Sequence, residues 1–348
     1  MTEFGEVLLT ARRARGMTQE ELADAAGVRQ AALSRYENGL RTPEPEILEQ
    51  LARALGVTPD LLQHAGRIEG GLAIGAHMRR RATAKPTVWR QIEAQLNMTR
   101  LHASRLFDEV SLVASLHVPT FDPVEVEPED AARLVRAQWR MPSGPVRSVS
   151  SWMETAGVLV IERDFGSSAR VDGLSQWVDG HPLVMVNASA PTDRLRFTLA
   201  HELGHLVLHS SYAQNDMEDA ANAFASEFLL PEVEVRVPLR GLTLSKALQL
   251  KPHWGVSIAA LIERAHQVRS ISSAQRASLY KALSARGFRV SEPGSLDLPP
   301  ETPRLATHIA DSLISRGLDA REIASLAGFA SESDNDLFSA GRPRLRLA

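Results

Sequence analysis

The segment that most constrains this chain is residues 197–209, an apolar stretch that carries the pattern HExxH at residues 201–205. Residues four apart on a helix share a face, so His201 and His205 can present two imidazole nitrogens to one zinc ion. Glu202 follows the first histidine, where its carboxylate can reach a water on the metal and take its proton. The alternative is a charged helix whose two histidines form ordinary hydrogen bonds, because a pattern with three fixed positions also recurs by chance.

A catalytic zinc ion usually needs a third protein ligand, and the candidates lie just downstream. Asp216, Glu218 and Asp219 precede an apolar segment with helical spacing. If that segment packs as a helix antiparallel to the first, one of these carboxylates reaches the metal, although spacing alone does not choose among them. His209 is a rival ligand four residues past His205, but it lies one turn further along, and a helix C-cap is its other interpretation.

The composition indicates a globular chain of several domains, since 348 residues with 44% hydrophobic and 23% charged side chains can bury a sizeable core. The absence of cysteine excludes disulfides, thiolate ligands and cysteine nucleophiles, so a metal would be held by histidines and carboxylates. The first residues do not resemble a signal peptide, and no apolar run approaches the roughly 18 residues of a membrane span. We therefore expect a cytoplasmic protein without a membrane partner.

The N-terminal residues 4–63 have the spacing of a five-helix bundle. The expected helices cover residues 5–15, about eight residues between Thr18 and Gly27, residues 29–38 and 45–55, and a segment beginning near residue 59. Thr18 and Glu21 predict a capping box, in which each side chain satisfies a free backbone N–H. Two short helices separated by a glycine-containing turn are typical of a helix-turn-helix.

Three segments of this module, residues 17–23 (MTQEELA), 27–28 (GV) and 33–39 (LSRYENG), resemble the XRE family of phage-repressor-like DNA-binding domains. In that family the third helix enters the major groove of double-stranded DNA. The alternative is a helical bundle that binds only proteins. The net charge of −3 over residues 1–66 favours that alternative, since DNA affinity depends strongly on basic contacts to phosphates.

The resemblance implies which side chains contact DNA. Gln30 and Arg35 are expected to read bases, because glutamine can form two hydrogen bonds with adenine and arginine can form two with guanine. Ala31 lies between them on the same helix. Phosphate contacts are expected from Gln19, Ser34 and Asn38. The expected partners are double-stranded DNA and, in a homodimer, a second copy of the chain.

Residues 66–119 are expected to connect two domains. The first part is rich in glycine and arginine, whereas residues 89–116 have helical spacing. Residues 67–90 carry a net charge of +5, and we interpret the run of Arg79, Arg80 and Arg81 within them as a solvated linker rather than a DNA-binding arm. His102 and His117 lie in or at the end of the helical stretch, where we expect surface or capping positions.

Residues 120–290 are expected to form an α+β domain with a small antiparallel sheet and the HExxH helix. Before that helix, the spacing predicts helices at 129–139 and 149–156 and strands at 157–161, 171–178 and 182–187. The last two strands form a hairpin around Asp179 and Gly180. The fold class is thus multidomain, with an all-α helix-turn-helix bundle at residues 1–65 ahead of the α+β domain. Residues 291–348 are expected to be a small helical segment that docks on the α+β domain, with helices at 305–316 and 319–327.

Four segments of the second domain resemble the ImmA/IrrE family of metallopeptidases and occur in the same order. They are residues 171–177, 194–209, 218–225 and 229–231. The resemblance implies a Zn²⁺ cofactor for which Glu218 completes the ligand set begun by His201 and His205. It also places Asn222 one turn beyond Glu218, where its side chain can hydrogen-bond a ligand.

The resemblance further implies cleavage of a repressor or another regulatory protein in a stress or mobile-element response. Because a helix-turn-helix lies on the same chain, we predict a DNA-binding transcriptional regulator with a zinc-dependent endopeptidase domain. An extended protein substrate could add as a strand along residues 174–178. The alternative is a DNA-binding regulator whose peptidase fold only senses a ligand or a partner.

Overall fold

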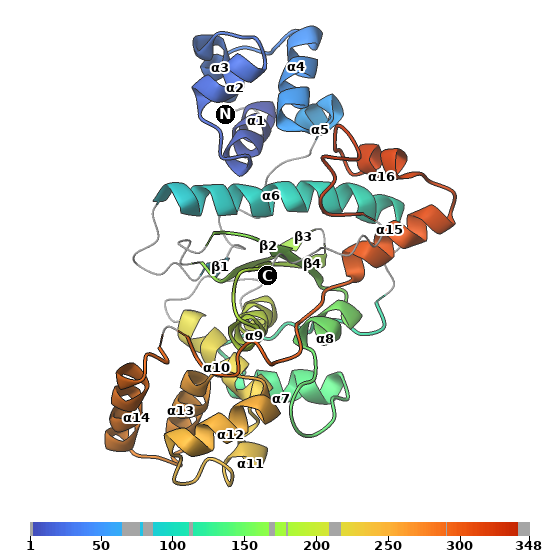
Figure 1. Ribbon diagram of the computed structural model, residues 1–348. Coiled ribbons are helices and arrows are strands. Elements are labelled where there is room, and N and C mark those ends of the chain that lie inside the picture. The colour runs from blue at the N-terminus through green and yellow to red at the C-terminus, as the bar shows by residue number, and fades with distance from the viewer. Residues whose placement is uncertain are drawn as a thin grey trace.

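The computed structural model describes residues 3–64, 77–78, 86–110, 114–166, 171–178, 180–208, 217–289 and 291–339. Within these ranges the chain is built in tiers (Figure 1): a helical bundle at one end, then a long helix, a small sheet, and a second group of helices. No helix in the described part of the chain is long and apolar enough to cross a membrane.

The N-terminal tier is the predicted five-helix bundle. Its helices are α1 (Glu3–Ala14), α2 (Gln19–Ala25), α3 (Gln30–Glu37), α4 (Pro45–Leu55) and α5 (Pro59–His64). The capping box of Thr18 and Glu21 is present at the start of α2, with both reciprocal hydrogen bonds formed. The apolar faces of these helices meet in one core, in which Leu8, Leu22 and Leu33 are fully buried.

The sheet has the strand order β1-β3-β4-β2. Its strands are β1 (His77–Met78), β2 (Leu159–Arg163), β3 (Gly173–Val178) and β4 (His181–Asn187). The predicted hairpin of β3 and β4 is antiparallel, but β2 pairs parallel with β4, so the sheet is mixed rather than antiparallel. Alternating apolar residues specify which face of a strand is buried and not the direction of its neighbour, which is why the sequence did not reveal this pairing.

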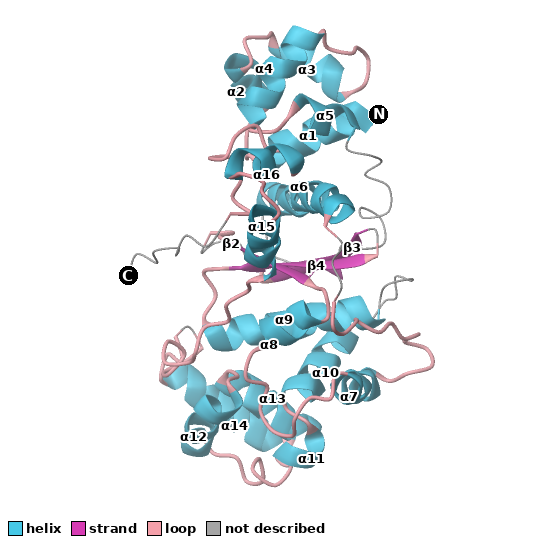
Figure 2. Ribbon diagram, turned by 90° about the vertical axis from the view of Figure 1, so that its right-hand side faces the viewer, coloured by secondary structure: helices cyan, strands magenta, loops and turns pink. Residues whose placement is uncertain are grey.

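Helices cover both faces of the sheet (Figure 2). Val158, Val160 and Val184 pack in one core with α9 (Thr192–Leu208) and α8 (Val149–Thr155). The alternate residues, including Leu159 and Leu183, pack in a second core with α6 (Pro86–Glu109) and α15 (Leu305–Ser315). The two-residue period of the strands therefore places the HExxH helix α9 directly against one face of the sheet.

A further group of helices lies on the side of α9 away from the sheet (Figure 1). They are α7 (Pro128–Gln138), α10 (Met217–Leu229), α11 (Glu232–Val235), α12 (Leu244–Trp254), α13 (Ile258–Gln267) and α14 (Ser273–Ala285). After them, residues 291–304 run back to the first turns of α9. There Glu301 pairs with Arg196 at 2.7 Å, and Lys251 bridges Asp193 at 2.6 Å and Glu292 at 2.8 Å.

The C-terminal segment contacts more than the α+β domain on which it was expected to dock. Its helices α15 and α16 (Ala320–Leu326) share the second core with the sheet. Beyond α16, Phe329 forms a β-bridge with Val57 of the N-terminal bundle. Backbone hydrogen bonds of 2.9 Å from Thr58 N–H to the Gly328 carbonyl and of 3.1 Å from Ala330 N–H to the Gly56 carbonyl flank this bridge. The segment therefore joins the sheet to the helical bundle.

The expected surface or capping position is wrong for His102, although His117 is exposed as expected. His102 is buried on α6, with Nδ1 2.7 Å from the Ala327 carbonyl oxygen and its ring stacked on Phe329. Helix α6 lies between the bundle and the sheet, so it is covered on two sides and buries polar side chains that a surface helix would expose. Burial lowers the pKa of His102 to about 4.

Candidate metal centre and nucleic-acid interface

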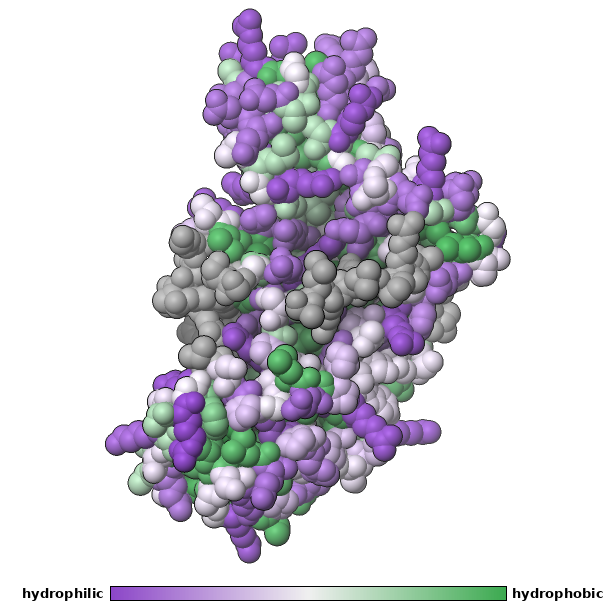
Figure 3. Space-filling model, viewed as in Figure 1, coloured by the Kyte–Doolittle hydropathy of each residue, from purple (hydrophilic) through white to green (hydrophobic). Residues whose placement is uncertain are grey.

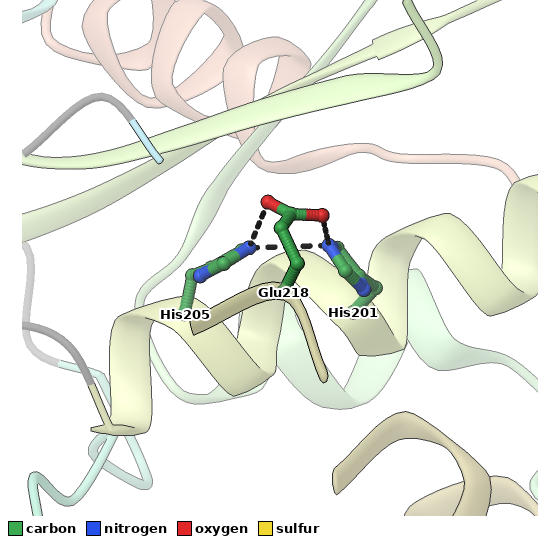
Figure 4. A group of neighbouring side chains, drawn as sticks. All are labelled: His201, His205 and Glu218. Carbon is green, nitrogen blue, oxygen red and sulfur yellow. Dashed lines mark hydrogen bonds and ion pairs between the residues drawn. The ribbon is translucent and has the colours of Figure 1, made fainter. Parts of the chain in front are cut away.

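Three side chains from α9 and α10 converge on one point (Figure 4). The Nε2 atoms of His201 and His205 are 3.1 Å apart. Glu218 lies in the first turn of α10, with its carboxylate oxygens 3.5 Å from His201 Nε2 and 3.4 Å from His205 Nε2. Both histidine side chains are 1% exposed and that of Glu218 is 44% exposed, so the cluster opens to solvent on the glutamate side.

Of the downstream candidate ligands, Glu218 is the one that the described structure brings to the histidines. Asp216 and the rival ligand His209 lie outside the described residues, as does Asp179 of the hairpin turn. Asp219 follows Glu218 on α10 and does not join the described cluster. Among the candidate ligands that the structure describes, the carboxylate of Glu218 therefore lies next to the two histidines.

The spacing of these donor atoms suits a metal ion. A tetrahedral zinc ion with bonds of about 2.0–2.2 Å separates neighbouring ligand atoms by about 3.3–3.6 Å. The two Nε2 atoms are 3.1 Å apart, and each lies 3.4 or 3.5 Å from a different oxygen of the Glu218 carboxylate. Imidazole nitrogen and carboxylate oxygen are also the donors that zinc accepts from a chain without cysteine. His201, His205 and Glu218 thus form a site that could hold a metal ion, with the solvent-facing side left for a further ligand.

The charge state of Glu218 agrees with that role. Burial alone would raise the pKa of its carboxyl group, but hydrogen bonds and charge from His201 and His205 outweigh burial. The result is a pKa well below the usual value for glutamate. Glu218 is therefore a carboxylate at neutral pH, which is the form that binds a cation.

Gly204, in the middle of the HExxH pattern, lets α10 approach α9 closely. A Cβ atom at this position would lie 3.2 Å from the Ala221 Cα atom and 3.1 Å from the Phe224 ring. The Ala221 Cα atom belongs to the α10 backbone and cannot rotate away. A glycine here allows the first turn of α10 to place Glu218 against the two histidines.

Asn222 lies one turn after Glu218 and contacts the ring of His201. Its Oδ1 atom is 3.1 Å from His201 Nδ1. Because an amide oxygen only accepts, this contact requires a proton on Nδ1, and in the neutral ring the lone pair of Nε2 then faces the cluster. The structure thus places the side chain that was expected to orient a ligand beside one of them.

Glu202 is buried between α9 and β3. The hydroxyl of Ser175 donates a hydrogen bond of 2.7 Å to Glu202 Oε2. Two residues earlier on the same face of β3, a Cβ atom at Gly173 would lie 3.1 Å from Glu202 Oε1. Sequence reasoning assigned no role to Ser175, because nothing in its local pattern indicates which helix lies under the strand.

A chain of hydrogen bonds holds the start of the recognition helix α3. Gln30 Nε2 donates to Gln19 Oε1 at 2.9 Å, and Gln19 Nε2 donates to Glu37 Oε2 at 2.7 Å. Arg12 closes the chain with two hydrogen bonds to the Glu37 carboxylate, at 2.5 and 2.9 Å. Gln30 is exposed, and its hydrogen bond to Gln19 holds its side-chain amide in one orientation.

The other expected DNA contacts lie on or next to the same helix. Ala31 and Arg35 are exposed, and Ser34 is half-buried. Asn38 is exposed but donates a hydrogen bond of 2.7 Å to the Ser34 carbonyl, so its amide is partly used within its own helix. The space-filling view shows hydrophilic side chains along the flanks of this tier and more apolar ones across its middle (Figure 3).

Two family models match separate parts of the chain. The helix-turn-helix model matches residues 8–62, and the IrrE N-terminal-like model matches residues 153–266. The first match covers α2 and α3, and the second covers the sheet strands from β2 to β4, α9 and α10. Each match lies inside one of the two domains expected from the sequence.

Three regulators of Bacillus subtilis (strain 168) are similar to the N-terminal part. The uncharacterized HTH-type transcriptional regulator RghRB is 41% identical over 71 residues, which is 20% of this chain and 51% of that protein. The HTH-type transcriptional repressor RghR is 42% identical over 71 residues, 20% of this chain and 53% of that protein. The SPbeta prophage-derived uncharacterized regulator YonR is 36% identical over 59 residues, 17% and 55% of the two chains.

The chain thus spans about half the length of the curated relatives that it matches, and those matches concern the helix-turn-helix. The helix-turn-helix match includes Gln30 and Arg35. The IrrE N-terminal-like match includes His201, His205 and Glu218. The chain therefore joins an XRE-type helix-turn-helix domain to a peptidase-like domain of the ImmA/IrrE kind.

Proposed function

We propose that this protein is a DNA-binding transcriptional regulator that carries a zinc-dependent endopeptidase. The observation that carries the proposal is the buried pair His201 and His205 with the carboxylate of Glu218 next to both, in a helix where Glu202 follows His201. A charged helix with satisfied histidines would not need a carboxylate from a second helix within 3.5 Å of both rings. The proposed substrate is a repressor or another regulatory protein.

In this proposal His201, His205 and Glu218 would hold Zn²⁺, which would act as a Lewis acid toward the attacking water and the scissile carbonyl. Glu202 takes a proton from the attacking water and later gives it to the leaving amine. Ser175 fixes one oxygen of the Glu202 carboxylate, so that the group stays oriented during both proton transfers. Asn222 keeps the proton of His201 on Nδ1.

The N-terminal domain supplies the second half of the proposal. Helix α3 enters the major groove, where Arg35 contacts guanine and Gln30 contacts adenine. The hydrogen-bond chain from Arg12 to Gln30 supports this assignment, because a base-reading amide must be held in one orientation. Arg35→Ala should weaken binding to the cognate operator by about 1–3 kcal/mol and relax base preference at one position.

The peptidase half is tested with purified zinc-loaded protein and repressor proteins encoded near its gene, with and without DNA. Glu202→Gln should retain zinc, measured by metal analysis, and lose cleavage, measured by mass spectrometry of the fragments. The double substitution His201→Ala/His205→Ala should lose both. Cleavage by Glu202→Gln at the wild-type rate would sink the mechanism, whereas zinc binding without cleavage of any repressor would favour a sensor.

A further inference from the structure

The outer edge of β3 is covered by a segment of the chain's own linker. Strand β1 consists of residues 77 and 78, which lie between the helix-turn-helix domain and α6. It pairs antiparallel with β3, with His77 opposite Ser175 and Met78 opposite Leu174. Without this pairing β3 would be an edge strand with unpaired backbone groups, because its other side is taken by β4 (Figure 1).

Strand β1 pairs with the part of β3 that contacts Glu202, the proposed catalytic base. Ser175, the β3 residue opposite His77, donates its hydroxyl to Glu202. On the same face of β3, Gly173 approaches the Glu202 side chain closely enough that an added Cβ would lie 3.1 Å from both Cγ and Oε1. A chain that pairs with β3 at Ser175 therefore runs alongside the metal centre.

An extended peptide that adds to β3 would compete for the same backbone groups. Strand addition gives affinity through main-chain hydrogen bonds, and each strand edge accepts one partner at a time. A two-residue strand forms few such bonds, so a longer peptide can displace it. The covalent linker nevertheless keeps β1 close to the edge at about millimolar effective concentration.

We propose that β1 occupies the substrate-strand position in cis, so that a peptide binds along β3 only when residues 77 and 78 leave that edge. This inference rests on the proposed function, since it concerns access to the same centre. It makes the linker between the two domains a competitor of the substrate. Because the competition uses backbone pairing, it depends on the backbone hydrogen bonds that residues 77 and 78 form with β3.

The test uses the zinc-loaded full chain with Glu202→Gln, so that no peptide is consumed. The probe is a fluorescein-labelled peptide with the sequence of residues 72–83, compared with a scrambled peptide of equal charge. One variant adds His77→Pro/Met78→Pro, which removes both backbone N–H donors from β1. The matched control adds His77→Ala/Met78→Ala, which keeps both donors.

Fluorescence anisotropy should show that the proline variant binds the probe about tenfold or more tightly than the parent and the alanine control. Hydrogen exchange of the amides of residues 174–176 should be faster in the proline variant without any peptide. Equal affinity in all three proteins, equal gains in the proline and alanine variants, or unchanged exchange overturns the proposal. These measurements do not depend on hydrolysis, so a wild-type protein that cleaves nothing would count against the proposed function alone.

Discussion

Ser175 on β3 and Glu202 on α9 are joined by a hydrogen bond of 2.7 Å between Oγ and Oε2. The two residues are 27 positions apart in the sequence, and they meet because alternate residues of β3 face α9. The bond fixes a buried carboxylate whose two oxygens could otherwise exchange places. Ser175 is therefore a positioning residue in the proposed reaction.

Removing that hydroxyl should slow cleavage without loss of zinc. Ser175→Ala is expected to lower kcat about 10–100-fold, because supporting hydrogen bonds around a metal site have effects of that size. Ser175→Thr, which keeps the hydroxyl, should recover much of the rate. The measurement is the pH profile of kcat together with zinc content, and an unchanged profile in Ser175→Ala would remove Ser175 from the mechanism.

The close packing at Gly204 predicts that alanine at this position destabilises the protein, although a change from glycine to alanine in a helix usually stabilises. In an unhindered helix, glycine to alanine stabilises by about 1 kcal/mol. At Gly204 the new Cβ would lie 3.2 Å from the Ala221 Cα, so α10 must move away from α9. We expect Gly204→Ala to destabilise by about 1–3 kcal/mol and to weaken zinc binding. Denaturant unfolding and a zinc competition titration would measure the two effects, and a more stable protein would contradict the packing argument.

The buried ion pair of Glu301 and Arg196 predicts a large loss of stability when Glu301 is replaced. It is buried, pairs with Arg196 at 2.7 Å, and accepts hydrogen bonds from Ser150 and from the Val149 N–H. Glu301→Gln leaves the Arg196 guanidinium buried without an opposite charge, which should cost about 3–5 kcal/mol. The exposed Glu332→Gln is the matched control and should change stability by less than about 0.5 kcal/mol. Equal unfolding temperatures of the two variants would show that the ion pair of Glu301 and Arg196 does not stabilise the protein.

His102 predicts a loss of stability on acidification. Burial lowers the pKa of His102 from 6.5 to about 4, so below pH 6.5 the unfolded chain binds a proton that the folded protein excludes. The stability that the folded protein gains from neutral His102 is fully present above pH 6.5 and declines as the pH falls toward 4. Between pH 7.5 and 5 the loss should be about 2 kcal/mol.

The control for that prediction is His102→Asn, which cannot titrate but keeps a donor for the Ala327 carbonyl. Unfolding free energies of both proteins are compared at pH 7.5 and 5, so that contributions from other histidines cancel. A wild-type protein whose stability falls no further than that of His102→Asn over this range would show that His102 is not the responsible group.

Local patterns explain how much of the fold was predictable. The capping box at Thr18, the helical period around His201 and the hairpin of β3 and β4 depend on residues close together in the sequence, and the structure has all three. The approach of Glu218 to the two histidines agrees with the resemblance, whereas spacing alone left it open among several carboxylates. The roles of these residues in catalysis and DNA reading remain predictions.

Long-range contacts account for what was missed. The parallel pairing of β2, the burial of His102 and the pairing of β1 with β3 each depend on a partner that no local pattern names. The helical spacing of residues 89–116 predicted a connecting helix, but not which parts of the chain would cover it. The burial of His102 depends on the C-terminal segment, since its contacts Ala327 and Phe329 lie more than 200 positions away.

The backbone contacts of residues 328–330 with residues 56–58 attach the helix-turn-helix domain to the body a second time, in addition to the packing of α1 on α6. These two sets of contacts hold α3 at one angle to the cluster of His201, His205 and Glu218 in this structure. If α3 enters a major groove as proposed, the same contacts set the angle between the DNA duplex and the peptidase-like domain.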